Sequence, residues 1–421
     1  MLRLQPSVWA KENADNWLRV RAAIAVSLDV IRAKTTAITK EKVDISLLFN
    51  AFTEDTIGKY IVDMERYGFD TLYADSGGLQ MVTTNRVITP ELKKDIYEVQ
   101  KLANYGFCFD EIPLGLKEGV DPLTGKHRSQ TSSKLFRQGE FDKCIAATAE
   151  NIKAQTEAFQ GTDTKAFYIL QGNSADEMYR WFEGGAKILE PHHYAHLQGI
   201  APADTCLGNG ELESVEMITA ARRVRNDFGV ERSGSHIHFL GVGSPSRLLP
   251  AIFLSQGGYL HEDTYVSFDS STASMSLIMG NLTSANGRRV RRGLVETVGF
   301  MMEFYDDMHD VIAEFCGEVS RDEFYQHALK HFKSIADMIN NAPPHMEVWM
   351  RAAITVMPLW QVVGFFQQTM DRINSPDVQY SGLGLLRQVK TDDDMAAWKR
   401  QFAKYLKSSR IDRVRENTLV F

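Results

Sequence analysis

Three carboxylates stand where short apolar runs of the sequence end. Asp75 follows "TLYA" and precedes two glycines, Asp110 follows "GFCF", and Asp269 follows "TYVSF". A fourth run ends in Gln171 and a fifth in Gly199. Each residue alone indicates little more than a turn, because Asp and Gly commonly start turns and cap helices. Three acids, an amide and a glycine at equivalent positions together favour a functional site.

These residue types favour retaining glycosyl transfer. One carboxylate can attack a sugar carbon as the nucleophile, while a second carboxylate donates or accepts the proton. The remaining acid can accept hydrogen bonds from guanine-type N–H groups, and an amide can donate one to a carbonyl oxygen. The acids and Gln171 therefore predict a site for a purine-like base.

The elements that position these residues are short runs rich in β-branched and aromatic side chains, separated by segments that are apolar at helical spacing. Strands that alternate with helices predict βαβ units and a parallel sheet. Seven such runs, with room for one more near the N-terminus, predict a closed eight-stranded (β/α) TIM-type barrel, in which the carboxyl ends of the strands share one face. A doubly wound open sheet is the competing architecture. The runs span residues 44–52, 71–78, 106–113, 166–173, 196–202, 236–245 and 264–271.

The strand pattern fades from about residue 295 onward, and the remaining segments are helical in pattern. We therefore expect the barrel to span residues 1–294. Residues 295–421 are expected to supply the last barrel helix and a helical C-terminal extension that packs on the barrel.

Composition narrows the class of protein. The 421 residues carry a net charge of −7, so binding to a polyanion must come from a local patch. The four cysteines lie far apart and form no CxxC motif, which fits reduced thiols in the cytoplasm. The N-terminus shows no secretory apolar region, and the most apolar stretch, residues 352–366, is too short to span a bilayer. We expect a cytoplasmic protein that makes no membrane contact.

An ordered set of motifs resembles the tRNA-guanine transglycosylase superfamily over about residues 70 to 275. Each block is modest alone, but their order and rough spacing are specific. The blocks are "ADSGGLQ", "FDEIPLG", "YILQGNSADEMYR", "HLQGIA", "HFLGVGSPSRLL" and "VSFDSS".

The resemblance implies a role for each of the five residues above. Asp269 is expected to attack C1′ of the sugar and form a covalent intermediate with the nucleic acid. Asp75 is expected to act as general acid and base, and Asp110 to accept hydrogen bonds from the guanine-type edge. Gln171 and the backbone at Gly199 are expected to hold the carbonyl side of the base.

The resemblance also covers the residues around the base. Ser76, Gly77 and Gly78 are expected to let the backbone approach a flat ligand, which only small residues permit. Leu79 and Leu240 stand where the family has an aromatic residue and a Met, so an apolar slot replaces a stacking ring.

Two departures from the family bear on the substrate. Only Cys316 occupies a plausible position in the region of the family's zinc site, and one Cys cannot build a four-ligand site. We expect no zinc and no other cofactor. The chain also lacks a C-terminal all-β RNA-binding module. It therefore looks similar to the branch, found in phages and bacterial DNA-modification clusters, that inserts a 7-deazaguanine such as preQ0 into DNA.

These departures favour DNA as the polymer, with tRNA as the alternative. The chain would then act in the cytoplasm, or in the host cytoplasm if a phage encodes it, and related enzymes often pair as homodimers. A cluster of arginines is expected to contact phosphates, although a solvated turn explains it equally well. The cluster comprises Arg288, Arg289, Arg291 and Arg292.

Two other classes of protein compete. A metal-dependent barrel hydrolase could use "HIH", which places His236 and His238 on one face of a strand. Both residues precede "FLGVG", at the start of the strand, so we expect structural or surface histidines and no metal. A non-catalytic partner subunit is the second alternative, but such paralogues tend to lose the acids that this chain keeps.

Overall fold

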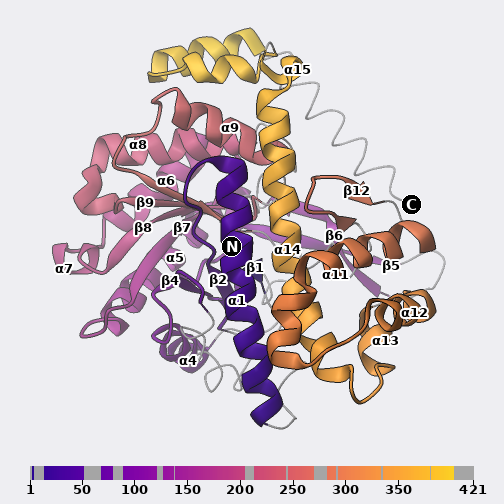
Figure 1. Ribbon diagram of the computed structural model, residues 1–421. Coiled ribbons are helices and arrows are strands. Elements are labelled where there is room, and N and C mark those ends of the chain that lie inside the picture. The colour runs from indigo at the N-terminus through magenta and orange to yellow at the C-terminus, as the bar shows by residue number, and fades with distance from the viewer. Residues whose placement is uncertain are drawn as a thin grey trace.

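A computed structural model of the chain describes residues 2–3, 14–51, 68–78, 89–120, 127–136, 138–203, 213–242, 245–269, 282–290, 293–332, 335–379 and 381–402. Its centre is a parallel sheet with helices packed against it (Figure 1). The predicted α/β class is therefore confirmed.

Seven strands follow one another across the sheet in sequence order, and every neighbouring pair is parallel. The two-residue strand β1 (Leu2–Arg3) pairs with β2 at one edge. The seven strands are β2 (Leu47–Asn50), β3 (Leu72–Asp75), β4 (Tyr105–Phe107), β7 (Lys165–Leu170), β8 (Leu197–Pro202), β9 (His236–Phe239) and β10 (Tyr265–Phe268). The helices between them are α4 (Pro90–Gln100), α5 (Phe141–Ala158), α6 (Ala175–Ala186), α7 (Pro191–Tyr194), α8 (Glu213–Ser233) and α9 (Pro245–Gln256).

The predicted closed eight-stranded barrel is wrong, because the sheet remains open. Closure requires the last strand to pair with the first, and within the described ranges β10 pairs only with β9. The expected eighth strand near the N-terminus is only the two-residue β1, and it is followed by the long helix α1 (Ala14–Thr39). The doubly wound alternative also fails, because its strand order reverses at a switch point, whereas this order does not.

The open sheet is strongly curled. Tyr73 on β3 and His238 on β9 have ring centroids 5.7 Å apart, although three strands lie between β3 and β9. A flat sheet would separate those strands by about 19 Å. Rings of Phe107 and Phe167 fill the same interior, with the Phe107 ring 4.8 Å from that of His238. The concave side is thus a packed core, as in a closed barrel.

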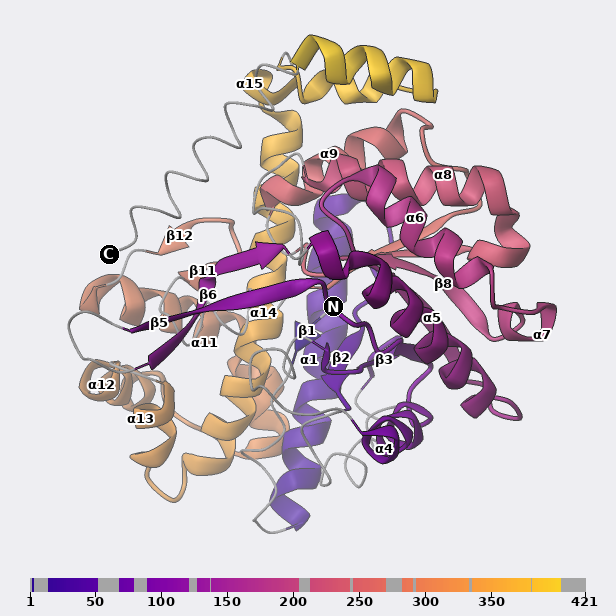
Figure 2. The same cartoon turned by 180° about the vertical axis from the view of Figure 1, so that it is seen from behind.

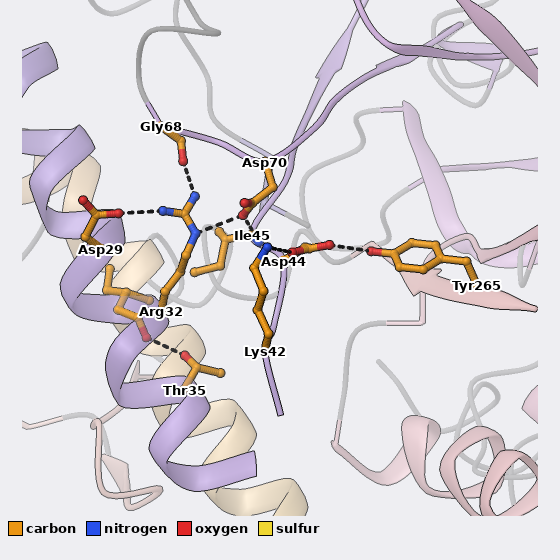
Figure 3. A network of polar contacts seen from close by, with 10 residues as sticks. Asp29, Arg32, Thr35, Lys42, Asp44, Ile45, Gly68, Asp70 and Tyr265 are labelled. Carbon is orange, nitrogen blue, oxygen red and sulfur yellow. Dashed lines mark hydrogen bonds and ion pairs between the residues drawn. The ribbon is translucent and has the colours of Figure 1, made fainter. Parts of the chain in front are cut away.

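Side chains join the two edges of the sheet where backbone pairing is missing. The Tyr265 hydroxyl on β10 donates to Asp44 Oδ2, just before β2, at 3.2 Å. Nearby, Asp70 accepts from the Ile45 amide at 2.8 Å and pairs with Arg32 of α1 at 2.9 Å (Figure 3). These contacts lie at the amino ends of the strands, opposite the predicted site, and tie α1 to the sheet.

The described C-terminal elements are helical, and two of them, α11 and α14, pack against α1. Figure 1 shows α1 and α14 running side by side, around a second buried cluster that includes Trp349 and Trp360. Helix α14 is long and apolar enough to cross a membrane, but 72% of its most apolar window is buried. The elements are α11 (Leu294–Cys316), α12 (Arg321–His331), α13 (Ile335–Asn340), α14 (Glu347–Asn374), α15 (Pro376–Gln379), a 3-10 turn (Gly384–Gln388) and a helix over 392–402.

Two antiparallel hairpins interrupt the alternation of strands and helices. Strands β5 (Leu114–Val120) and β6 (His127–Phe136) form the longer one, which extends away from the parallel sheet (Figure 2). Strands β11 (Leu282–Thr283) and β12 (Arg289–Val290) form the shorter one. The sequence pattern predicted neither hairpin.

We expect Gly199→Ala to destabilise the fold by about 3 kcal/mol, because it forces overpacking in a central strand. A methyl group on Gly199 would overlap the backbone carbonyl oxygen of His236 on the adjacent strand. Chemical denaturation measures the change. Gly139→Ala, where the added methyl meets open space, is the matched control, and an equal loss of stability in both variants would contradict this packing argument.

Candidate functional site

The predicted site residues lie where the parallel strands end. Asp75 is the last residue of β3, and Asp269 directly follows β10. Gln171 directly follows β7, Leu240 follows β9, and Asp110 lies three residues beyond β4. Ligands of open parallel sheets bind outside these carboxyl ends, and the five residues therefore lie at the edge of the sheet where a ligand would bind.

Asp110 and Gln171 form a buried pair. Gln171 Nε2 donates to Asp110 Oδ2 at 2.6 Å, and the two residues are 1% and 5% exposed, respectively. Gly78 lies directly against this pair, because a methyl group in its place would stand 2.6 Å from Asp110 Oδ1. The second glycine of "DSGG" is therefore needed for the Asp110 carboxylate to occupy its position.

The turn that carries Gly78 is fixed by its neighbours. Gly77 has φ +80°, a conformation that favours glycine. The Ser76 hydroxyl is buried and donates to the Cys108 carbonyl oxygen at 3.1 Å. Ser76 thereby links the turn after β3 to the segment after β4, which leads to Asp110.

Burial sets the charge state of Asp110. It raises the pKa of the Asp110 carboxyl from 3.8 to about 7, while the hydrogen bond from Gln171 opposes the rise and the electrostatic interaction with Asp75 adds to it. A pKa shifted this far by burial is typical of functional sites.

The pKa of the Asp269 carboxyl is shifted in the opposite direction to that of Asp110. Burial alone would raise the pKa of its carboxyl, but the hydrogen bonds from His238 and the Gly241 amide outweigh burial and lower it. The Gly241 amide donates to Asp269 Oδ1 at 2.7 Å, and His238 Nε2 lies 3.4 Å from the same oxygen. Across the described ranges, Oδ2 of Asp269 has no hydrogen bond. An ionised carboxylate with one oxygen anchored and the other unengaged is suited to nucleophilic attack.

His238 contacts the predicted nucleophile Asp269, although the sequence pattern assigned it no role in the site. The histidines of "HIH" were expected to be structural or on the surface, and His236 and His238, at 1% and 0% exposed, are buried inside the curled sheet. His238 pairs in register with Ser267 on β10, two residues before Asp269. The alternation of side chains in "HIHF" and "VSFD" could have predicted this contact, but only if these two strands were known to be neighbours.

Several predicted residues are not brought into this group. Gly199 lies within β8 and pairs with His236. Ala203, which bridges to Leu240, marks the level of the site on this strand. Gly199 is therefore about 13 Å away from the site along the strand. Leu79, Arg291 and Arg292 lie outside the described residues. Arg288, on the turn between β11 and β12, pairs with Glu303 of α11.

Cys316, the single residue at a family zinc position, lies buried at the end of α11, and burial raises the pKa of its thiol to about 11. The described residues contain no group of three or more His, Cys, Asp or Glu side chains arranged to hold a metal ion.

The chain matches no known family model and no curated protein sequence.

Proposed function

We propose that this protein is a transglycosylase that exchanges guanine in DNA for a 7-deazaguanine base through a covalent aspartyl–sugar intermediate. The observation that carries the proposal is the buried Asp110–Gln171 pair, set against Gly78 at the same strand ends as Asp75 and Asp269. The ordered motifs shared with the tRNA-guanine transglycosylase superfamily support it.

The buried pair matches the hydrogen-bonding edge of guanine. An ionised Asp110 accepts from the N1–H and exocyclic amino groups of the base. The Gln171 amide donates to Asp110, and a side-chain amide can also donate to a carbonyl oxygen such as O6 of the base. A buried, fully paired polar edge of this kind discriminates strongly against bases that lack the matching groups.

The reaction follows in two balanced displacements. Asp269 Oδ2 attacks C1′, the C1′–N9 bond breaks, and Asp75 gives its proton to the departing guanine. The incoming base then loses its N9 proton to Asp75 and attacks C1′, which releases the Asp269 carboxylate. Because one N-glycosidic bond replaces another, the exchange needs no external energy source.

The identity of the polymer rests on the departures from the family. Val311 and Ala313 stand where further zinc ligands of the tRNA enzymes would precede Cys316. The exposed Arg289, with Arg288 beside it, offers positive charge to phosphates. The catalytic acids would serve DNA or tRNA equally well.

We expect radiolabelled guanine to enter duplex DNA when the full chain is incubated with DNA and bulk tRNA in parallel reactions. Unlabelled preQ0 should then displace that label. Label that enters tRNA alone would identify a tRNA-modifying enzyme and contradict the DNA assignment. No label in either polymer, together with no covalent protein–nucleic acid adduct on denaturing gels, would contradict transglycosylation itself.

A further inference from the structure

Ser267 lies at the centre of a buried hydrogen-bonded group next to Asp269. Its hydroxyl is 2.6 Å from His236 Nε2 and 2.7 Å from His238 Nδ1. His238 then reaches Asp269 Oδ1 with its other nitrogen, Nε2, at 3.4 Å. A continuous chain therefore runs from His236 through Ser267 and His238 to the carboxylate.

The number of available protons fixes the direction of this chain. Burial lowers the pKa of both histidines, so both are neutral at pH 7 and each ring carries one N–H. Asp269 is ionised and can only accept, so His238 must carry its proton on Nε2. His238 Nδ1 is then an acceptor, and the Ser267 O–H is the only proton available to it within the chain.

The remaining partner of Ser267 is fixed as a consequence. A hydroxyl donates one hydrogen bond and can accept two. Since Ser267 donates to His238, the Nε2–H of His236 must donate to Ser267. The hydrogen bonds from His236 to Asp269 therefore all run in one direction.

We propose that Ser267 holds His238 as the Nε2–H tautomer, and that His238 in this form positions Asp269 with Oδ2 directed to the reacting sugar carbon. Ser267 and His238 are thus positioning residues. The inference rests on the proposed function, because it assigns their role to the attack by Asp269. The Gly241 amide supplies the second contact to Oδ1, so the two donors fix the carboxylate plane jointly.

The role of His238 as a donor to Asp269 can be tested by replacing it with two amide side chains of different length. His238→Gln places an amide N–H near the former Nε2 and keeps a donor for Asp269, whereas the shorter His238→Asn cannot reach it. We expect His238→Ala and His238→Asn to slow covalent adduct formation with DNA by about 10- to 100-fold, as for a misplaced reactive group. His238→Gln should recover at least tenfold of that loss.

His192→Gln, an exposed histidine on α7, is the control and should leave the rate unchanged. Circular dichroism and thermal melts check that each variant is folded. Equal rates in His238→Gln and His238→Ala, or a wild-type rate in His238→Ala, would overturn the inference.

The tautomer of His238 can be determined by NMR, independently of any activity measurement. Long-range ¹H–¹⁵N spectra of the full chain, labelled at histidine, should show His238 protonated on Nε2 and unprotonated on Nδ1. Ser267→Ala should introduce a second tautomer of His238 and slow adduct formation. A wild-type His238 protonated on Nδ1 would overturn the inference, as would a Ser267→Ala variant with unchanged tautomer and unchanged rate.

These results separate the inference from the function on which it rests. A wild-type protein that forms no adduct and exchanges no base contradicts the proposed function and the assigned role together. An active wild-type protein whose His238→Ala variant is equally active contradicts only the positioning role.

Discussion

Asp269→Asn is expected to abolish the covalent protein–DNA adduct and to lower base exchange by about 10³-fold or more, because removing a nucleophile eliminates the chemical step it performs. The variant keeps the size of the side chain, and its amide oxygen can still accept from the Gly241 amide that now reaches Oδ1. Base binding and folding should therefore survive. Denaturing gels with labelled DNA measure the adduct, and label exchange measures turnover.

Asp393→Asn is the control for this substitution. It removes the same charge from an exposed position on the helix over 392–402 and should exchange base at the wild-type rate. An adduct that persists in Asp269→Asn would show that another group attacks the sugar. The contacts of Oδ1 would then serve only to fold the turn after β10.

The parallel sheet could be predicted from the sequence because its signals are local. Each strand is a short buried run such as "AFYIL", and each is followed by a helix with an apolar face. Once the strands are parallel, residues after their ends share one edge. Asp75, Asp110, Gln171 and Asp269 could therefore be placed together without knowing any contact between them.

Closure of the barrel could not be predicted, because it depends on contacts between distant parts of the chain. Asp44 and Tyr265 meet across the open edge, and α1 packs on α14 more than 300 residues later. Neither contact leaves a periodic pattern in the sequence. The same count of βα units is compatible with a closed barrel or with a curled open sheet.

Strand register explains the positions of Gly199 and His238, which the sequence pattern could not give. Gly199 stands near the end of its motif, yet β8 continues to Pro202, and Gly199 packs on His236 instead. His238 was assigned to the amino end of its strand, but it is the third of the four residues of β9. It therefore reaches a residue that follows the neighbouring strand.

Asp110→Asn should have the second large effect. It should weaken the binding of guanine but stabilise the fold. It should weaken binding of guanine by about 10- to 100-fold, because hydrogen bonds to a charged acceptor are worth about 1.5–3 kcal/mol. It should also raise the free energy of unfolding of the free protein at pH 8 by about 4 kcal/mol, since it removes an ionised carboxylate from a buried position.

The pH dependence of this gain has a definite sign. The folded protein holds the Asp110 proton up to about pH 7, whereas the unfolded chain releases it near 3.8. The folded state therefore binds more protons between these values, and wild-type stability falls as the pH rises through this window. The advantage of Asp110→Asn should be near zero below about pH 4, grow up to about pH 7 and then stay constant. Urea denaturation at a series of pH values measures it.

Glu111→Gln is the control, because Glu111 is the adjacent acid, is partly exposed and pairs with Lys93 at 3.8 Å. It should show no comparable gain in stability and no loss of guanine binding. A more stable protein that binds the base more weakly is the result expected when a buried charge destabilises the fold but is needed to bind the ligand. If Asp110→Asn instead destabilises the protein at pH 8, the buried carboxylate stabilises the fold. Its assignment as the acceptor for the base would then lose its physical basis.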